Sequence, residues 1–261
     1  MTRPASAEGR FRAVAFDLFD TLVDFDPQRI PEVIIDGRRE RTTSRAAYDA
    51  LFEAGYHLPN YPAFHLLWLD TSRELWEERN RSPEYLEVSS TERFRRLLDR
   101  LVSIPGPKKE EAAALARDTH MEAIIGSAGF PAARFAMLDR IREAGLRMGV
   151  ISNFDHTPAA HRLLERRGLS GYLDVVVVSE EEGFRKPAPR LFLKAAGGLG
   201  AVPGEALFVG DDFEADVRGA QAAGMPCAWL NRRGEAPPEG AAPPDFEIRK
   251  VEETLRLLSL A

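Results

Sequence analysis

The stretch FRAVAFDLFDT, residues 11–21, joins a continuous apolar run to two aspartates and a threonine. A run that is apolar at consecutive positions is typical of a strand covered on both faces of a parallel sheet. Four later runs have the same character: LRMGVI (146–151), DVVVV (174–178), ALFVG (206–210) and PCAWL (226–230). Ligands bind outside the carboxyl ends of the strands in such a sheet, so a site is expected where the first run becomes acidic.

Helical patterns separate the later runs. They start with proline or end with glycine, which are helix start and stop signals, and they cover ARFAMLDRIREAG (133–145), PAAHRLLERRG (158–168), PAPRLFLKAAGGLG (187–200) and EADVRGAQAAG (214–224). The tail FEIRKVEETLRLL (246–258) predicts a short strand and a closing helix. This alternation predicts an α/β fold with a doubly wound parallel sheet.

The stretch from about 28 to 128 interrupts the alternation and shows no convincing strand. It contains four amphipathic helical patterns: TSRAAYDALFEAGY (43–56), AFHLLWLDTSRELWEERN (63–80), STERFRRLLDRLV (90–102) and KKEEAAALARDTHMEAII (108–125). These patterns predict an all-helical cap inserted after the first strand. The expected domains are a core of residues 1–22 and 129–261 and a cap of residues 23–128.

Composition excludes several classes of protein. The 261 residues include 41 acidic and 35 basic side chains, for a formal net charge of −6. A nucleic-acid surface needs a clustered basic excess, so no nucleic-acid partner is expected. The single cysteine, Cys227, excludes a disulfide framework and a thiolate metal cage, and is predicted to be a buried apolar residue.

Targeting signals are not evident in the sequence. The first ten residues contain no apolar stretch of the kind found in signal peptides. No run reaches the ~18 apolar residues that a transmembrane helix needs. We therefore expect a cytoplasmic protein with a small-molecule substrate and no membrane partner, while the sequence leaves the oligomeric state open.

Polar residues follow the first two strands. A carboxylate at Asp17, with Thr21 after it, is placed to serve as a nucleophile or a metal ligand, and a turn-capping aspartate is the alternative. Ser152 and Asn153 follow the second strand, where a hydroxyl and an amide can hold an anionic oxygen. An ordinary helix N-cap or turn is the alternative there.

Charged residues follow the third and fourth strands. Lys186, one of only five lysines, precedes a proline that restricts its backbone, so its ammonium can neutralise a substrate anion. Asp211, Asp212 and Asp216 lie within six residues and repel one another unless a cation is bound. Oxygen ligands of this kind suit Mg²⁺, although Asp212 can instead cap the following helix.

These four motifs, each at the end of its own strand, resemble those of the haloacid dehalogenase-like hydrolase superfamily. The resemblance covers residues 11–22 and about 130–230 and implies a Rossmann-like core, and the insert looks like that superfamily's helical C1 cap. It implies that Asp17 is the nucleophile, that Ser152 binds the transferred group and that Lys186 orients and neutralises it. Mg²⁺ would be held by Asp17, Asp211 and the Phe19 backbone carbonyl, with Asp216 supporting the site from behind or through water.

One position departs from the phosphatases of that superfamily. Their second aspartate, the general acid and base, is replaced by Phe19, and the nearest acid, Asp20, comes one residue later. Neighbouring side chains in a strand point to opposite faces, so this offset is not simply repaired. An aromatic residue at this position resembles the true haloacid dehalogenases, which attack carbon and work without metal.

Three functions are therefore open. The acids around Asp17 favour a Mg²⁺-dependent phosphatase that acts through an aspartyl-phosphate, with Asp20 as the candidate proton-transfer group. Phe19 and Asn153 fit a metal-independent 2-haloacid dehalogenase with Asp17 as nucleophile. A non-catalytic ligand-binding protein with the same fold is the third hypothesis, and the retained Asp17, Ser152, Lys186 and Asp211 argue against it.

The cap offers less information about specificity. Four arginines of the cap are candidates for binding a substrate anion: Arg38, Arg39, Arg41 and Arg45. The alternative is that they form a solvated helix face. Trp68 and Trp76 are expected to form the core of the cap together with Leu66, Leu69 and Leu75. His156 lies four residues beyond Ser152, where it could contact substrate, and a surface position is the expectation for it.

Overall fold

Strand β1 (Ala13–Phe16) lies near the middle of a six-stranded parallel sheet in the computed structural model, which describes residues 10–35 and 37–260. The strand order is β10-β9-β8-β1-β6-β7. The other strands are β6 (Arg147–Ser152), β7 (Val175–Val178), β8 (Ala206–Gly210), β9 (Cys227–Leu230) and β10 (Phe246–Ile248). This sheet confirms the predicted doubly wound α/β core.

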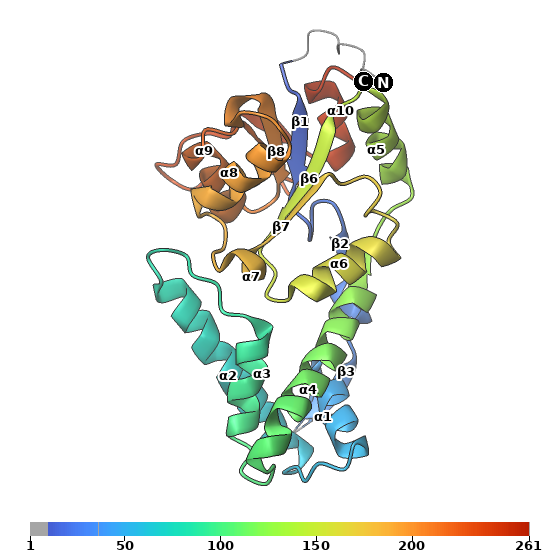
Figure 1. The fold of residues 1–261 in the computed structure, drawn as a ribbon, viewed down its shortest axis with the longest axis vertical. Coiled ribbons are helices and arrows are strands. Elements are labelled where there is room, and N and C mark those ends of the chain that lie inside the picture. The colour runs from blue at the N-terminus through green and yellow to red at the C-terminus, as the bar shows by residue number, and fades with distance from the viewer. Residues whose placement is uncertain (1–9, 36, 261) are drawn as a thin grey trace.

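Both faces of the sheet are covered, which explains the continuous apolar runs. Val14 and Phe16 of β1 pack into one apolar cluster, while Ala13 and Ala15 pack into the cluster on the opposite face. Helices α5 (Ala133–Glu143), α6 (Thr157–Arg166) and α10 (Thr254–Leu257) cover the first face, and α8 (Pro189–Gly198) and α9 (Arg218–Ala222) cover the second (Figure 1). Cys227 is buried in the second cluster, as predicted.

The chain order creates a crevice beside β1. From β1 the chain continues to β6 and β7 on one side, then returns to β8, β9 and β10 on the other. Such a switch point is where open α/β sheets bind their ligands. The expected helix at 214–224 is instead a π-helical turn, Phe213–Val217, followed by α9.

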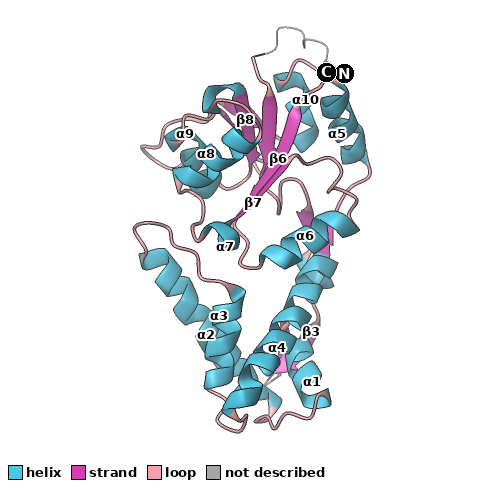
Figure 2. Ribbon diagram, viewed as in Figure 1, coloured by secondary structure: helices cyan, strands magenta, loops and turns pink. Residues whose placement is uncertain are grey.

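The insert folds around its own apolar cluster. Its helices are α1 (Ser44–Glu53), α2 (Tyr61–Arg81), α3 (Ser90–Asp99) and α4 (Gly106–Ser127) (Figure 2). Phe64, Trp68 and Phe94 are buried between them. Trp76 is 55% exposed, so the expectation that both tryptophans belong to the cap core is wrong for Trp76. Leu75 is buried, but Leu66 and Leu69 are exposed as well.

The insert also contains a β-hairpin where no strand is expected from the sequence. Strands β3 (Glu32–Ile35) and β4 (Arg38–Arg41) pair antiparallel, and Gly37 between them has a positive φ of 77°. The expectation of an insert without strands is therefore wrong at this hairpin. The Asp-Gly dipeptide at 36–37 is a hairpin signal in the sequence.

Two linkers between cap and core pair with each other. β2 (Asp24–Phe25) and β5 (Ala128–Gly129) form a short antiparallel ladder, and α4 runs from the cap end of the molecule toward the sheet (Figure 1). Arg134 on α5 donates to the Leu22 carbonyl at 2.8 Å and to Asp24 Oδ1 at 2.7 Å. The predicted boundaries at 22/23 and 128/129 fall at this ladder and stay a prediction.

Three remaining elements are 3-10 helices, Pro27–Arg29, Pro203–Glu205 and Val251–Glu253, and α7 (Ser179–Glu182) is a single helical turn. No helix in the described part of the chain has the length and apolar character required to cross a membrane.

Candidate active site

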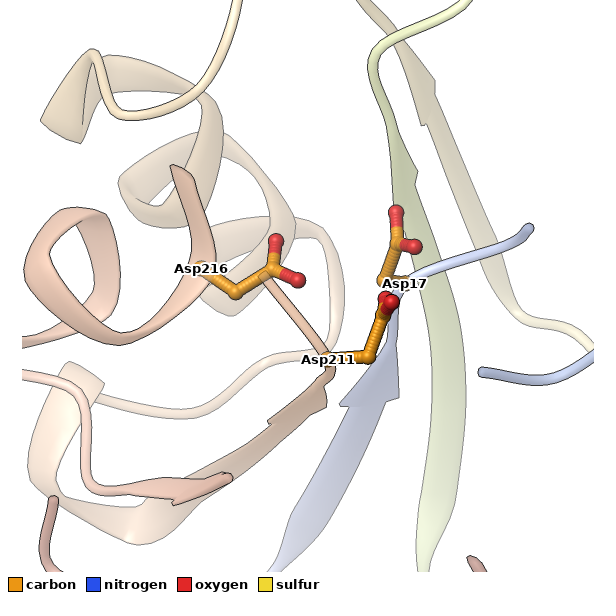
Figure 3. Close-up of side chains that lie close together, drawn as sticks. All are labelled: Asp17, Asp211 and Asp216. Carbon is orange, nitrogen blue, oxygen red and sulfur yellow. The ribbon is translucent and has the colours of Figure 1, made fainter. Parts of the chain in front are cut away.

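Three carboxylates meet at the carboxyl ends of β1 and β8. Asp17 follows β1, Asp211 follows β8 and Asp216 lies in the π-helical turn, and one oxygen of each lies within 4.8 Å of the others (Figure 3). The Asp17 N–H donates to the Val209 carbonyl at 2.8 Å, which extends the ladder between β1 and β8 into the site. The structure thus brings together the three aspartates that the sequence singles out.

Gly210 makes room for Asp216. A Cβ at position 210 would lie 2.6 Å from the Asp216 Cβ, closer than real Cβ contacts come. Asp216 Oδ2 accepts from the Asp212 N–H at 3.1 Å, which turns its carboxylate toward the site. Asp212 Oδ1 accepts from the Ala215 N–H at 2.7 Å, so Asp212 has the capping contact that the sequence offers as its alternative.

Lys186 is buried between two of these carboxylates. Its side chain is 3% exposed, and Nζ donates to Asp17 Oδ1 and, at 2.6 Å, to Asp216 Oδ1. Asn153 holds the lysine backbone from both sides, because its Oδ1 accepts from the Lys186 N–H at 2.6 Å and its Nδ2 donates to the Lys186 carbonyl at 3.0 Å. The expected substrate contact of Asn153 stays a prediction, but both of its amide atoms already bind the lysine.

Ser152 and Thr21 are two buried hydroxyl-bearing residues near the carboxyl end of β1. Ser152 is the buried last residue of β6, the strand paired with β1. Thr21 is fully buried, and its Oγ1 donates to Asp211 Oδ1 at 3.1 Å. Thr21 therefore orients a candidate metal ligand, while binding of a transferred group by Ser152 stays a prediction.

Phe19 and Asp20 face different surroundings. The Phe19 ring packs against Phe154 and Phe25, with centroid separations of 5.1 and 6.2 Å. Asp20 is exposed and has a positive φ of 54°, and its Oδ1 accepts from the Phe25 N–H at 3.2 Å. Asp20 and Asp211 both line one pocket of about 440 Å³, so Asp20 shares a cavity with one of the three clustered carboxylates.

The negative charge of the three carboxylates exceeds the positive charge of the Lys186 ammonium that lies among them. Burial raises the pKa of Asp17 to about 8, with Asp216 and Asp211 adding to the effect and Lys186 opposing it. Burial and the Asp216 charge raise the pKa of Asp211 to about 7, and burial raises the pKa of Asp216 against the opposing Lys186 ammonium. Burial alone would lower the pKa of Lys186, but Asp17 and Asp216 outweigh it and raise it.

Mg²⁺ fits this donor set. The Lys186 ammonium is bonded to Asp17 and Asp216, whereas Asp211 accepts from the Thr21 hydroxyl. Three buried carboxylates beside one ammonium repel one another, and the raised pKa values of Asp17 and Asp211 agree with a site that disfavours the full negative charge without a further cation. Hard oxygen donors in small number are what Mg²⁺ takes up in proteins. The chemistry of the residues therefore agrees with the Mg²⁺ site inferred from the sequence.

Several residues near the site could not be identified from the sequence. The indole N–H of Trp229 donates to the Asp211 carbonyl at 2.9 Å, and Arg232 donates to the Asp20 carbonyl. Both lie on β9 or the loop after it and carry no motif, so only the fold reveals them. His156 is 4% exposed, which makes the expected surface position wrong.

Three of the four cap arginines considered from the sequence bind acids or carbonyls within the cap and its linker, and the fourth, Arg38, is exposed. Arg39 and Arg41 ion-pair with Glu32, with closest N–O separations of 3.1 and 3.5 Å, and Arg45 pairs with Asp49 at 2.8 Å. β3 and α1 lie at the end of the cap far from the sheet (Figure 1). The solvated alternative describes this group better than a substrate contact.

A carboxylate at the end of the first strand, a buried lysine, paired acids and an inserted helical segment are the features that the sequence analysis relates to a family of hydrolases. The chain belongs to the haloacid dehalogenase-like hydrolase family, whose model matches residues 11–224. The superfamily inferred from the sequence is thereby confirmed.

Similar proteins include several phosphatases. The chain is 32% identical to the glyceraldehyde 3-phosphate phosphatase of Methanopyrus kandleri, over 94% of this chain and 95% of that protein. It is 30% identical to the ribulose-1,5-bisphosphate 5-phosphatase of Halopiger xanaduensis, over 82% of each. The phosphoserine phosphatase of Thermus thermophilus is 34% identical over 61% of each chain.

Solved structures share the fold. A 2-haloacid dehalogenase from Pseudomonas syringae superposes with a TM-score of 0.72 at 24% identity, covering 95% of this chain and 98% of that one. A phosphatase of the same family from Thermococcus onnurineus gives a TM-score of 0.63 at 21% identity, covering 96% and 99%. At these identities the likeness shows the fold alone, and the chemistry has to be argued from the residues of the site.

Proposed function

We propose that this hydrolase cleaves the phosphate monoester of a small metabolite, with Asp17 as the nucleophile. The observation that carries the proposal is the buried group in which Lys186 bridges Asp17 and Asp216 while Asp211 lies within 4.8 Å. The phosphatases among the similar proteins act on small phosphorylated compounds by their names, which supports the same substrate class here. The cytoplasmic location expected from the sequence stays a prediction.

Asp17 performs the covalent step. An Asp17 carboxylate oxygen attacks phosphorus, the bond from phosphorus to the ester oxygen breaks, and the alcohol leaves with one proton. Water then attacks the aspartyl-phosphate, releasing inorganic phosphate and restoring the Asp17 carboxylate. Lys186 neutralises part of the charge on the phosphoryl oxygens, and Ser152 binds the same group at the end of β6.

Mg²⁺ would be held by Asp17, Asp211 and the Phe19 carbonyl. When bound, it stabilises the charge of the transferring phosphoryl group as a Lewis acid. Asp216 supports the site, because its Oδ1 already accepts from Lys186 and its Oδ2 from the Asp212 N–H. The Thr21 hydroxyl fixes the orientation of the Asp211 carboxylate by donating a hydrogen bond to its Oδ1.

Asp20 is the proposed proton-transfer group. Phe19 is packed between Phe25 and Phe154 and brings no acid to the position usual in phosphatases of this family. Asp20 lines the pocket that Asp211 also lines, so a water or a leaving oxygen in that pocket can reach it. Esters with good leaving groups, which need little protonation, are therefore expected to be the better substrates.

The aromatic surroundings of Phe19 favour one alternative, hydrolysis of a 2-haloacid. In that reaction Asp17 displaces halide from carbon to form an ester, and water then hydrolyses the ester. Three carboxylates with one ammonium count against it, because a metal-free site would have to bear their charge. The third hypothesis, ligand binding without turnover, predicts neither reaction.

Turnover of an aryl phosphate separates these functions. Purified protein is assayed with Mg²⁺ and with EDTA, with Asp17→Asn as the blank, and halide release from 2-haloacids is measured in parallel. Mg²⁺-dependent phosphate release that disappears in Asp17→Asn is the expected result. Halide release without metal would refute the proposal in favour of a 2-haloacid dehalogenase. No turnover in either assay would favour the non-catalytic ligand-binding protein.

A further inference from the structure

The α2–α3 loop, residues 82–89, crosses from the cap to the core. Two backbone hydrogen bonds attach it to the chain just before Lys186: the Arg185 N–H donates to the Tyr85 carbonyl at 2.8 Å, and the Glu87 N–H donates to the Gly183 carbonyl at 3.0 Å. The residues between them form an isolated antiparallel bridge, Leu86 with Phe184. The cap thus adds a strand-like contact to the segment that carries the catalytic lysine.

Buried charges reinforce this contact. The Asp155 carboxylate lies 3.3 Å from Arg79 and 3.4 Å from Arg93, both on cap helices. Arg79 also pairs with Glu87 at 2.8 Å, and Glu87 accepts from the Ser179 hydroxyl at 2.5 Å. The four charged side chains are between 4% and 20% exposed. They form a largely desolvated junction between cap and core.

The same junction reaches the loop after β6. The Asp155 carbonyl accepts from the Ser90 N–H, at the start of α3, at 2.7 Å. Asp155 comes two residues after Asn153, which holds both backbone polar groups of Lys186. Through these contacts the α2–α3 loop and the start of α3 touch both core segments that position the lysine.

We propose that Asp155 is a positioning residue, whose ion pairs dock the α2–α3 loop and thereby hold Asn153 and Lys186 in their catalytic arrangement. The kinetic part of this inference rests on the proposed function, whereas the structural part does not. Asp155 acts through Asn153 and Lys186, and none of its observed contacts is with Asp17 or Asp211.

Asp155→Asn is the direct perturbation. Asparagine keeps the shape and the backbone carbonyl but removes the charge shared by Arg79 and Arg93. A buried arginine that loses its acid must regain water, which favours an undocked loop. Asp49→Asn is the matched control, because Asp49 also pairs with an arginine, Arg45, but on the exposed surface of the cap.

Amide hydrogen exchange measures the docking without any need for turnover. A peptide covering 182–189 reports the Arg185 and Lys186 amides, which are bonded to Tyr85 and Asn153. Local opening of a docked segment raises exchange while the core stays protected. Asp155→Asn should raise exchange in this peptide by about tenfold or more, with the β1 peptide unchanged and Asp49→Asn like the wild type.

Steady-state kinetics with an aryl phosphate provide the second readout. Misplacement of a catalytic group by about 1 Å can cost on the order of 100-fold, so kcat of Asp155→Asn should fall by roughly that factor. KM should change less than kcat, because Asp155 has no observed contact with Ser152 or with the candidate Mg²⁺ ligands Asp17 and Asp211, which stay in place. Glu87→Gln removes the other acid of the junction and should shift both readouts in the same direction, which covers the case in which Asp155→Asn fails to fold.

Wild-type exchange in the 182–189 peptide of both variants would overturn the proposal, as would increased exchange with unchanged kcat. If the wild type turns over no phosphate ester, the proposed function fails on its own. In that case hydrogen exchange of the Lys186 amide still tests the structural part of the inference. Loss of its protection in Asp155→Asn supports the positioning contact, and retained protection refutes it.

Discussion

Gly210→Ala tests the geometry of the acid cluster most sharply. The new Cβ would lie 2.6 Å from the Asp216 Cβ, whereas ordinary contact begins at 3.4 Å. The Asp216 Cβ must therefore move by about 0.8 Å, and its Cγ and Oδ2, which would lie closer still, must move farther. This movement is costly because Asp216 is buried in a close-packed site. The same movement strains the 2.6 Å bond from Lys186 Nζ to Asp216 Oδ1.

Two effects are expected from this movement. Overpacking a buried site costs about 1–3 kcal/mol of unfolding free energy. Displacement of the group that fixes Lys186 should lower kcat on the order of 100-fold. Thermal unfolding and aryl-phosphate kinetics, measured on the same preparation, check both numbers.

Gly197→Ala is the matched control. Gly197 lies in α8, and a Cβ there would meet nothing within 4 Å. Alanine is the better helix former, so the unfolding free energy of this variant should equal that of the wild type or exceed it by up to about 1 kcal/mol. Its kcat should be unchanged. If Gly210→Ala behaves like Gly197→Ala in both assays, the steric role assigned to Gly210 and the support assigned to Asp216 are refuted.

Three further predictions follow from the site and the cap. Asp211→Asn should abolish Mg²⁺ binding in titration calorimetry and Mg²⁺-activated turnover while leaving the unfolding temperature nearly unchanged, and wild-type affinity for Mg²⁺ would contradict the ligand assignment. Asp20→Asn should lower kcat by about 10²–10⁴-fold for alkyl phosphates and much less for aryl phosphates, so an equal loss for both ester classes would exclude Asp20 as the proton donor. Burial, reinforced by Arg93 and His156, holds the pKa of His120 well below its usual 6.5. The unfolded chain then binds a proton that the folded chain does not, so stability is full above pH 6.5 and falls as the pH drops below it. Urea unfolding at pH 7.5 and 5.5 should show this loss, at most about 1.4 kcal/mol per pH unit for this histidine. His120→Gln should reduce the pH dependence, and an unchanged dependence would contradict the assignment.

The sheet could be predicted from the sequence because its strands are buried on both faces. Val14 and Phe16 pack into one cluster and Ala13 and Ala15 into the other, so β1 is apolar at every position. The hairpin in the cap lacks this signal. β4 is RRER, entirely charged and mostly exposed, and its pairing depends on the turn at Gly37 and on neighbours in β3.

The acid cluster could be predicted because the strand topology alone determines which residues meet. Parallel strands bring their carboxyl ends to one edge of the sheet, so Asp17 and Asp211 meet although they are far apart in sequence. The role of Asn153 could not be predicted in the same way. Its two bonds to Lys186 depend on how two loops face each other, and no local pattern specifies that.

Burial in the cap was also difficult to predict. Trp68 and Trp76 lie eight residues apart on α2, yet one is buried against α3 while the other is 55% exposed, with the Arg185 guanidinium 5.3 Å from its ring centroid. Helical periodicity places both on similar faces, but the packing partners differ along the helix. The docking of the α2–α3 loop depends on the same long-range arrangement.

Mass spectrometry of the acid-quenched enzyme tests the central claim most directly. Wild-type protein is mixed with excess aryl phosphate and Mg²⁺, quenched within one turnover and digested. The account predicts one added phosphoryl group on the peptide that contains Asp17, labile to base and absent in Asp17→Asn. Turnover with the phosphoryl group on any other residue, or an ester formed on Asp17 from a 2-haloacid instead, would contradict it.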